Sequence, residues 1–344
     1  MRHPLILGMG FMLLSAFFFA VSGPVAKGLY EAGWTPGSVV LVRLAGATLA
    51  LGAPTLLALR GRWAQVRAQW RLIAVYGVVS MAGVQSFYFL AIEHLSVAVA
   101  VLLEVMGAPL LVVLWLWVRT RVAPSAVTGL GALLCAVGVV LVLDLADASL
   151  SWLGIGLALA AAACFAFYFV ISARQTMALP ALPLTGLGMG AGAITVLIAN
   201  ASQAMPAHYV NADVSFAGTH MPWYAPTSLL IVFTVLAYVC GVLGLRHLGA
   251  TVGSFANLVE VPVSAVAAWW LLGESLTIRQ IAGTCVVLTG IALVKWGDLT
   301  RQPSTITGSA GDAQRPDSPA LASGRALPQP QGDNQRTPAS QQML

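Results

Sequence analysis

The chain has 344 residues, of which 58% are apolar and only 8% are charged, and its mean hydropathy is +0.85. Soluble proteins carry about 25% charged residues, and a soluble fold of this composition would expose a nearly continuous apolar surface. The composition therefore excludes an ordinary water-soluble globule. Nucleic-acid binding is excluded as well, because it needs many basic residues on one face and the 17 Lys and Arg residues are spread thinly.

A bilayer core of about 30 Å requires about 20 apolar residues per helix. Dividing the chain at its charged, Pro-rich and polar segments predicts an all-α integral membrane protein with ten transmembrane helices. Two of the breaks between helices, at 93–95 and 246–248, are very short. The predicted spans are 5–26, 36–59, 71–92, 95–118, 124–143, 151–173, 183–203, 225–246, 250–272 and 278–296.

Outside the spans, residues 300–344 contain mainly Pro, Ser, Gln, Gly, Asp and Arg, which predicts a disordered tail because such a segment buries too little surface. The histidines lack the spacing of metal ligands, and no C-x-x-C pair occurs, so we expect no metal and no cofactor. Four cysteines lie in apolar runs, where they are predicted to be small buried side chains: Cys135, Cys164, Cys240 and Cys285.

The two halves of the chain align with each other at a shift of 152 or 153 residues. The aligned pairs are 91–96 with 244–249, Pro109 with Pro262, Trp117 with Trp270, Gly131 with Gly283 and Gly138 with Gly290. This predicts two five-helix repeats, 1–145 and 150–297. Because five is odd, the second copy crosses the membrane in the opposite direction, as in the inverted repeats of secondary transporters. The first span matches an internal helix, which argues against the alternative of a cleaved signal peptide.

The basic residues indicate the orientation of these repeats. With the N terminus inside, most Lys and Arg fall in cytoplasmic segments, and only Lys27 and Arg279 fall in external ones. At the equivalent short breaks Glu93 is replaced by Arg246, as expected for loops on opposite sides of a membrane. We therefore predict a multi-pass protein of the plasma membrane with both termini in the cytoplasm.

Three ionisable residues, Arg43, Glu104 and Glu260, lie deep within predicted spans. Such a group costs about 2.5–3.5 kcal/mol on insertion scales, so each is a candidate for function. The repeat places both glutamates on equivalent helices one turn apart, with Glu104 aligned on Asn257. Two readings remain open for Arg43: it neutralises a glutamate to hold the bundle together, or it binds a substrate carboxylate.

Further polar groups accompany these residues. Pro109 and Pro262 each remove a helical hydrogen bond, and we expect the carbonyls of Val105 and Leu258 to be released beside the carboxylates as a cradle for an ammonium or a proton. Other polar residues at membrane depth either contact substrate or bond between helices; they are Gln85, Tyr88, Tyr168, Tyr238, Ser254 and Asn257.

Several motifs together resemble the EamA-type transporters of the drug/metabolite transporter superfamily, over about 5–296. They are Glu260-Val261-Pro262, the Gly-Glu turn within 272–277, the spaced Gly283 and Gly290, the opening segment 22–27, and Arg43 in the second helix. The chain departs from the family pattern in two places. Val261 separates the glutamate from the proline, and Arg119-Thr120-Arg121 stands where the first repeat often has a Gly-Glu turn.

The resemblance implies a secondary transporter of small metabolites that works by alternating access, and it favours export of amino acids or related compounds. No ATP-binding signature is present, so Glu104 or Glu260 is expected to couple protons to transport. The alternatives are a uniporter or importer of a sugar or nucleoside and, outside transport, a membrane receptor or scaffold. No nucleophile with a base is found for an enzyme. One chain with two repeats suffices as a monomer, and a homodimer stays open.

Overall fold

The computed structural model describes residues 2–92, 94–95, 97–143, 151–174, 179–216, 219–263, 266–267 and 278–299. The chain divides into two units, 1–302 and 303–344. The second unit, which holds most of the tail that the composition predicts to be disordered, lies outside the described residues, so that prediction stays untested.

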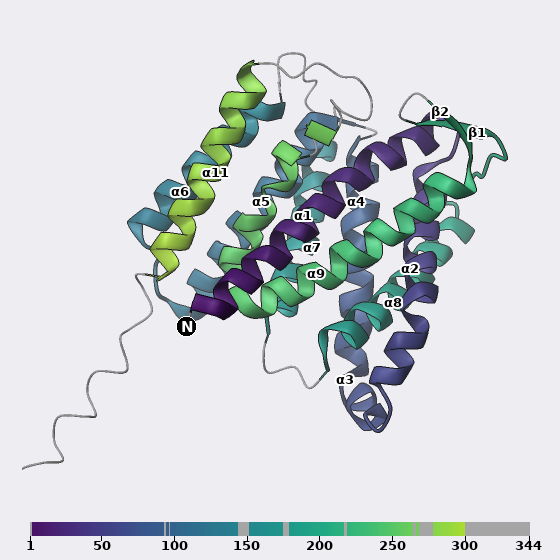
Figure 1. Cartoon of the computed structure of the whole chain (residues 1–344), viewed down its shortest axis with the longest axis horizontal. Coiled ribbons are helices and arrows are strands. Elements are labelled where there is room, and N and C mark those ends of the chain that lie inside the picture. The colour runs from purple at the N-terminus through teal and green to yellow at the C-terminus, as the bar shows by residue number, and fades with distance from the viewer. Residues whose placement is uncertain are drawn as a thin grey trace, which may run out of the picture. The chain divides into compact units, whose positions relative to one another are not determined.

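Helices form almost all of the first unit (Figure 1). Most of these helices are apolar around all sides, as expected for helices buried in lipid and protein, whereas α3 carries Gln65, Arg67, Gln69 and Arg71. The first half contains α1 (Arg2–Glu31), α2 (Pro36–Ala58), α3 (Trp63–Tyr76), the π-helical turn η1 (Gly77–Gly83), α4 (Val84–Ile92), α5 (Val97–Thr120) and α6 (Ala126–Leu143). The second half contains α7 (Trp152–Ser172), α8 (Ala181–Ala201), α9 (Tyr224–Asn257) and α11 (Ile278–Leu299).

Within the described residues, seven helical segments are long and apolar enough to cross a membrane, and two shorter apolar helices cover Ala126–Leu141 and Ile281–Gly297. This agrees with a multi-pass membrane protein but does not confirm the count of ten. The predicted eighth span and the start of the ninth are two helical segments of α9, separated by a kink. Residues 264–265 and 268–272 of the ninth span lie outside the described residues.

The predicted break between the spans 225–246 and 250–272 coincides with a kink at Gly249. The helix continues through His247, whose Nδ1 lies 2.8 Å from the carbonyl oxygen of Leu243. The backbone leaves helical geometry at Gly249, with φ 79° and ψ 171°. Only glycine adopts this conformation without a steric penalty, so the chain reverses direction at Gly249 and not at the preceding polar residues.

Two features were not predicted from the sequence. Antiparallel strands β1 (Asp213–Phe216) and β2 (Thr219–Pro222) form a hairpin in what we expected to be a long loop, and it contacts α1 and α9. The third span begins at Trp63, eight residues before its predicted start, and contains the π-helical turn η1. The buried-cysteine prediction is wrong for Cys285, which is exposed, whereas Cys135 is buried.

Equivalent contacts occur in the two halves. A Cβ on Gly8 would meet the Cβ of His247, and a Cβ on Gly154 would meet the Cβ of His94, the residue aligned with His247. At the junction of α6 and α11, which lie side by side in Figure 1, Gly131 faces Gly290 and Gly138 faces Gly283. Since Gly131 aligns with Gly283 and Gly138 with Gly290, each of these contacts repeats the other, as a pseudo-twofold axis between the halves requires.

The α6–α11 contact yields a stability prediction. A Cβ on Gly290 would lie 2.7 Å from the Gly131 carbonyl oxygen, whereas a Cβ on Gly129 of the same helix pair meets nothing within 4 Å. We expect Gly290→Ala to lower the free energy of unfolding by about 1–3 kcal/mol, because backbone atoms must move apart. Gly129→Ala should leave it unchanged or raise it by up to about 1 kcal/mol. Thermal unfolding in detergent checks both, and equal effects would contradict the packing.

Candidate functional site

The buried arginine of α2 is anchored to α9. Arg43 is 8% exposed, and its Nε–H donates a hydrogen bond to Thr234 Oγ1 over 3.1 Å. Thr234 donates its own proton to the Leu230 carbonyl oxygen of the same helix, 2.7 Å away, so its oxygen is oriented to accept from Arg43. Arg43 also lies within electrostatic reach of Tyr30, Tyr238 and Glu260.

The two glutamates of the predicted site lie close enough to interact electrostatically. Glu104 belongs to α5 and is 9% exposed, and Glu260 follows α9 and is half-buried. Glu104 and Glu260 belong to the predicted fourth and ninth spans, which the internal alignment makes equivalent.

Asn257, the residue aligned with Glu104, contacts Glu260 directly. Its Nδ2 donates a hydrogen bond to Glu260 Oε2 over 2.9 Å. Asn257 is the residue that the alignment places opposite Glu104, so one repeat supplies a carboxylate where the other supplies an amide donor. The surroundings of the two carboxyls therefore differ: Glu260 has an amide donor from Asn257, although the repeats are otherwise related by symmetry.

Tyrosines and one glutamine complete this cluster. Tyr238 of α9 forms a side-chain hydrogen bond with Gln85 of α4 and interacts electrostatically with both glutamates. Tyr88 of α4 lies within electrostatic reach of Glu104, Glu260 and Tyr30. We define the central cluster as Arg43, Gln85, Tyr88, Glu104, Tyr238, Asn257 and Glu260.

The sequence missed three neighbours of the central cluster. Tyr30 was placed outside the first span because Lys27 and Glu31 suggested its end, whereas α1 continues to Glu31. Thr234 carries no charge, and Cys164, which lies within electrostatic reach of Glu104, resembles any apolar residue. The sequence offered one signal for Tyr30: the apolar pattern extends past Lys27, which indicates a longer first helix.

Two predicted details differ from the structure. The Leu258 carbonyl is not released by Pro262, because the shift to a tighter turn lets the Val261 N–H donate to it over 3.1 Å. Ser254 is fully buried, but its hydroxyl donates to the Thr251 carbonyl oxygen of its own helix over 2.9 Å. The hydroxyl proton therefore bonds within its own helix and not between helices.

An aromatic layer borders the central cluster. Tyr168 of α7 packs edge-on against Tyr238, with ring centroids 5.7 Å apart, and stacks with Tyr76 at 6.2 Å. The Tyr76 hydroxyl is 2.9 Å from Ser172 Oγ and hydrogen-bonded to it. The Tyr168 hydroxyl is buried without a hydrogen-bond partner among the described residues, and it occupies the space that a side chain on Gly241 would need.

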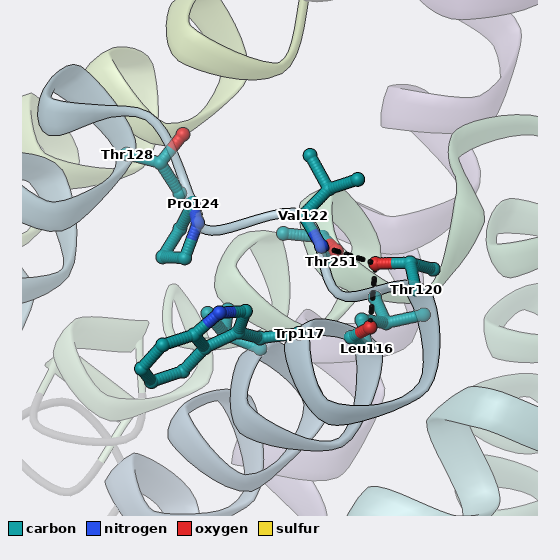
Figure 2. Close-up of a pocket in the computed structure, with 8 residues that line it drawn as sticks. Leu116, Trp117, Thr120, Val122, Pro124, Thr128 and Thr251 are labelled. Carbon is teal, nitrogen blue, oxygen red and sulfur yellow. Dashed lines mark hydrogen bonds between the residues drawn. The ribbon is translucent and has the colours of Figure 1, made fainter.

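A separate cavity of about 320 Å³ lies away from this cluster, at the junction of α5, α6 and α9 (Figure 2). None of its lining residues belongs to the central cluster. Among the described residues, no group of three or more His, Cys, Asp or Glu side chains that could hold a metal ion is found.

Two ranges of the chain, 6–144 and 152–296, match the model of the EamA-like transporter family. The chain belongs to the EamA-like transporter family. Membership makes this protein a membrane transporter of the drug/metabolite transporter superfamily. The matched ranges lie within the two predicted repeats, and the two halves of the EamA fold meet through the equivalent glycine contacts described above.

Comparison with solved structures gives the same fold for this EamA protein. A chain described only as "Crystal structure of protein" superposes with a TM-score of 0.63 at 18% identity, covering 85% of this chain and 97% of that one. At this identity the similarity concerns the fold alone. A comparison with curated proteins finds no significant match.

The Arg43 anchor predicts a measurable loss of stability. We expect Thr234→Val to lower the free energy of unfolding by about 1–3 kcal/mol, because the buried guanidinium loses its acceptor. Thr195→Val is the matched control, since the Thr195 hydroxyl bonds to the Ala191 carbonyl of its own helix. Thermal unfolding of both variants checks this, and a smaller loss for Thr234→Val than for Thr195→Val would contradict the anchor.

The stacked tyrosines predict opposite effects for the same substitution. Tyr168→Phe should raise the free energy of unfolding by about 1 kcal/mol, because it removes a buried hydroxyl without a partner. Tyr76→Phe should lower it by about the same amount, because the bond to Ser172 is lost. The measurement is thermal unfolding in the absence of substrate. Destabilisation by Tyr168→Phe would show that this hydroxyl is satisfied.

Proposed function

We propose that this EamA protein is a secondary active transporter that exports amino acids or related amines across the plasma membrane, in exchange for protons. The observation that carries the proposal is the pair of carboxyls of Glu104 and Glu260, which interact with each other deep in an apolar bundle. An ionisable group in this position is costly, and it persists where it serves transport.

The pair of carboxyls supports exchange. The central cluster holds two carboxyl groups that interact with each other and one guanidinium that interacts with Glu260, so with both carboxyls ionised the site gains from binding one more positive charge. A proton and a substrate ammonium both bind to carboxylate oxygens and therefore compete for them. One leaves as the other arrives, and an inward proton gradient then drives the amine outward.

Arg43 supports recognition of the other end of an amino acid. Its bond to Thr234 uses the Nε–H and not the two terminal NH2 groups, which suit a substrate carboxylate. Tyr88 and Tyr238 add aromatic faces beside the carboxyls, and such faces attract ammonium groups. Asn257 fixes Glu260 while leaving Glu104 to respond to the substrate.

Alternating access follows from the repeated architecture. The cluster is built from α2, α4, α5 and α9, which belong to both halves, so movement of one half against the other changes the side from which it is reached. The break at Gly249 lies in α9 between Arg246 and the glutamate-bearing segment, and is a suitable hinge. With both termini in the cytoplasm, α9 enters from the external side.

The test is substrate-dependent proton movement in proteoliposomes with a trapped pH dye, using amino acids, amines, nucleosides and sugars. We expect a signal with amino acids or amines, and its loss in Glu104→Gln or Glu260→Gln. Glu31→Gln is the matched control, because Glu31 is an exposed glutamate at the end of α1 and should transport normally. Thermal unfolding verifies that each variant is folded.

Other outcomes separate the alternatives. Labelled substrate exchange without proton movement would identify a uniporter or substrate exchanger and give the glutamates a binding role. Proton movement with sugars or nucleosides alone would show that the substrate belongs to one of those classes and is not an amino acid or amine. Absence of flux for every compound, with a folded protein, would favour a receptor or scaffold.

A further inference from the structure

The separate cavity has an apolar wall from α5 and a polar rim. Val113, Leu116 and Trp117 line it from α5, Pro124 and Thr128 from the start of α6, and Thr251 from α9 (Figure 2). Ser125 accepts a hydrogen bond from the Thr128 N–H over 3.0 Å and so begins α6. Thr120 accepts from the Val122 N–H over 3.3 Å and fixes the loop on the opposite side.

Two arginines flank this cavity. Arg119 and Arg121 lie on either side of the lining residue Thr120, and both are exposed. Arg119 is positioned over the Trp115 ring, with Cζ 5.6 Å from the centroid. The sequence from 105 to 121 contains no acidic residue. The two residues next to Thr120 therefore bring positive charge close to the cavity.

Arg121 occupies a conformation that favours glycine. Its φ is 57°, and its N–H donates to the Trp117 carbonyl oxygen over 2.8 Å, which closes the end of α5. Helices commonly end this way with glycine, and another residue in the left-handed region costs about 1–2 kcal/mol. The aligned residue of the other repeat is Glu274, of opposite charge. A basic residue is retained here against a conformational cost.

We propose that this cavity binds an anionic phospholipid of the cytoplasmic leaflet. An acyl chain enters between Leu116, Trp117 and Pro124, and the phosphate contacts the arginines at the rim. A volume of about 320 Å³ accommodates part of one chain and not a whole lipid. The predicted orientation places the end of α5 at the cytoplasmic surface, where anionic lipids are available.

The lipid would contact elements from both halves of the chain. The lining comes from α5, from the loop that leads to α6, and from α9 two residues after the break at Gly249. A bound chain would therefore brace the α6 junction against the start of the glutamate-bearing segment. This inference concerns lipid binding and does not depend on which substrate the central cluster takes.

Native mass spectrometry of the whole chain, released from uncharged detergent and titrated with phosphatidylglycerol or phosphatidylcholine, tests the proposal. We expect the first phosphatidylglycerol to bind more tightly than phosphatidylcholine. The double variant Arg119→Gln/Arg121→Gln should weaken it about 25-fold, from about 1 kcal/mol for each basic residue. Arg60→Gln/Arg62→Gln is the matched control, with the same spacing in the exposed loop after α2, and should bind as the unaltered chain does.

Two single variants separate the cavity from the charges. Thr251→Leu fills the cavity without changing charge and should weaken binding of both lipids. Arg121→Gly removes the strained conformation, so it should raise the unfolding temperature in phosphatidylcholine while weakening phosphatidylglycerol binding. This combination distinguishes loss of a lipid contact from loss of folding.

Three results would overturn the proposal. If the Arg60 and Arg62 substitutions weakened phosphatidylglycerol binding equally, the effect would come from surface charge in general and not from this cavity. Unchanged phosphatidylglycerol binding in Thr251→Leu would show that the chain does not enter the cavity. Displacement of the lipid by glycerol phosphate at equal concentration would identify a soluble anion as the ligand.

Discussion

The cost of placing ionisable groups inside an apolar bundle governs this structure. Arg43, Glu104 and Glu260 each lie where an isolated charge is expensive, and the protein gathers them instead of separating them. The guanidinium is held by Thr234 and the Glu260 carboxyl by Asn257, so these two groups have a neutral hydrogen-bond partner in addition to their ionisable neighbours. A transporter needs these ionisable groups to be only partly paired with one another, since a site in which every group is fully paired would not bind and release its substrate.

The internal repeat explains how one chain brings these groups together. Contacts of Gly8 and Gly154 with the equivalent histidine turns, and of Gly131 and Gly138 with α11, show the same interface built twice. Helices that pack through glycine approach closely in a membrane, where apolar side chains gain little from leaving lipid. The glycine contacts thus form a closely packed frame, while the polar residues of the central cluster differ between the halves.

The two sites for which we propose a function both include positions where the repeats differ. Asn257 stands opposite Glu104, and Arg121 stands opposite Glu274. The first difference gives a carboxylate a fixed hydrogen-bond donor at the centre. The second places a strained arginine beside a cavity at the end of α5. At both positions the two repeats carry different residues, so the internal symmetry of the fold is broken there.

The sequence by itself determined the membrane class, the repeat, the family and the three deep charges, because hydropathy, glycine spacing and buried ionisable residues are local signals. Most of the central cluster was identified in the same way. Only the tertiary structure decided that Thr234 holds Arg43, that Tyr30 is a neighbour, that Ser254 bonds within its own helix and that the Leu258 carbonyl is satisfied. These depend on which faces of distant helices meet and on how a proline turn tightens, and hydrogen bonds of that kind leave no periodic trace in the sequence.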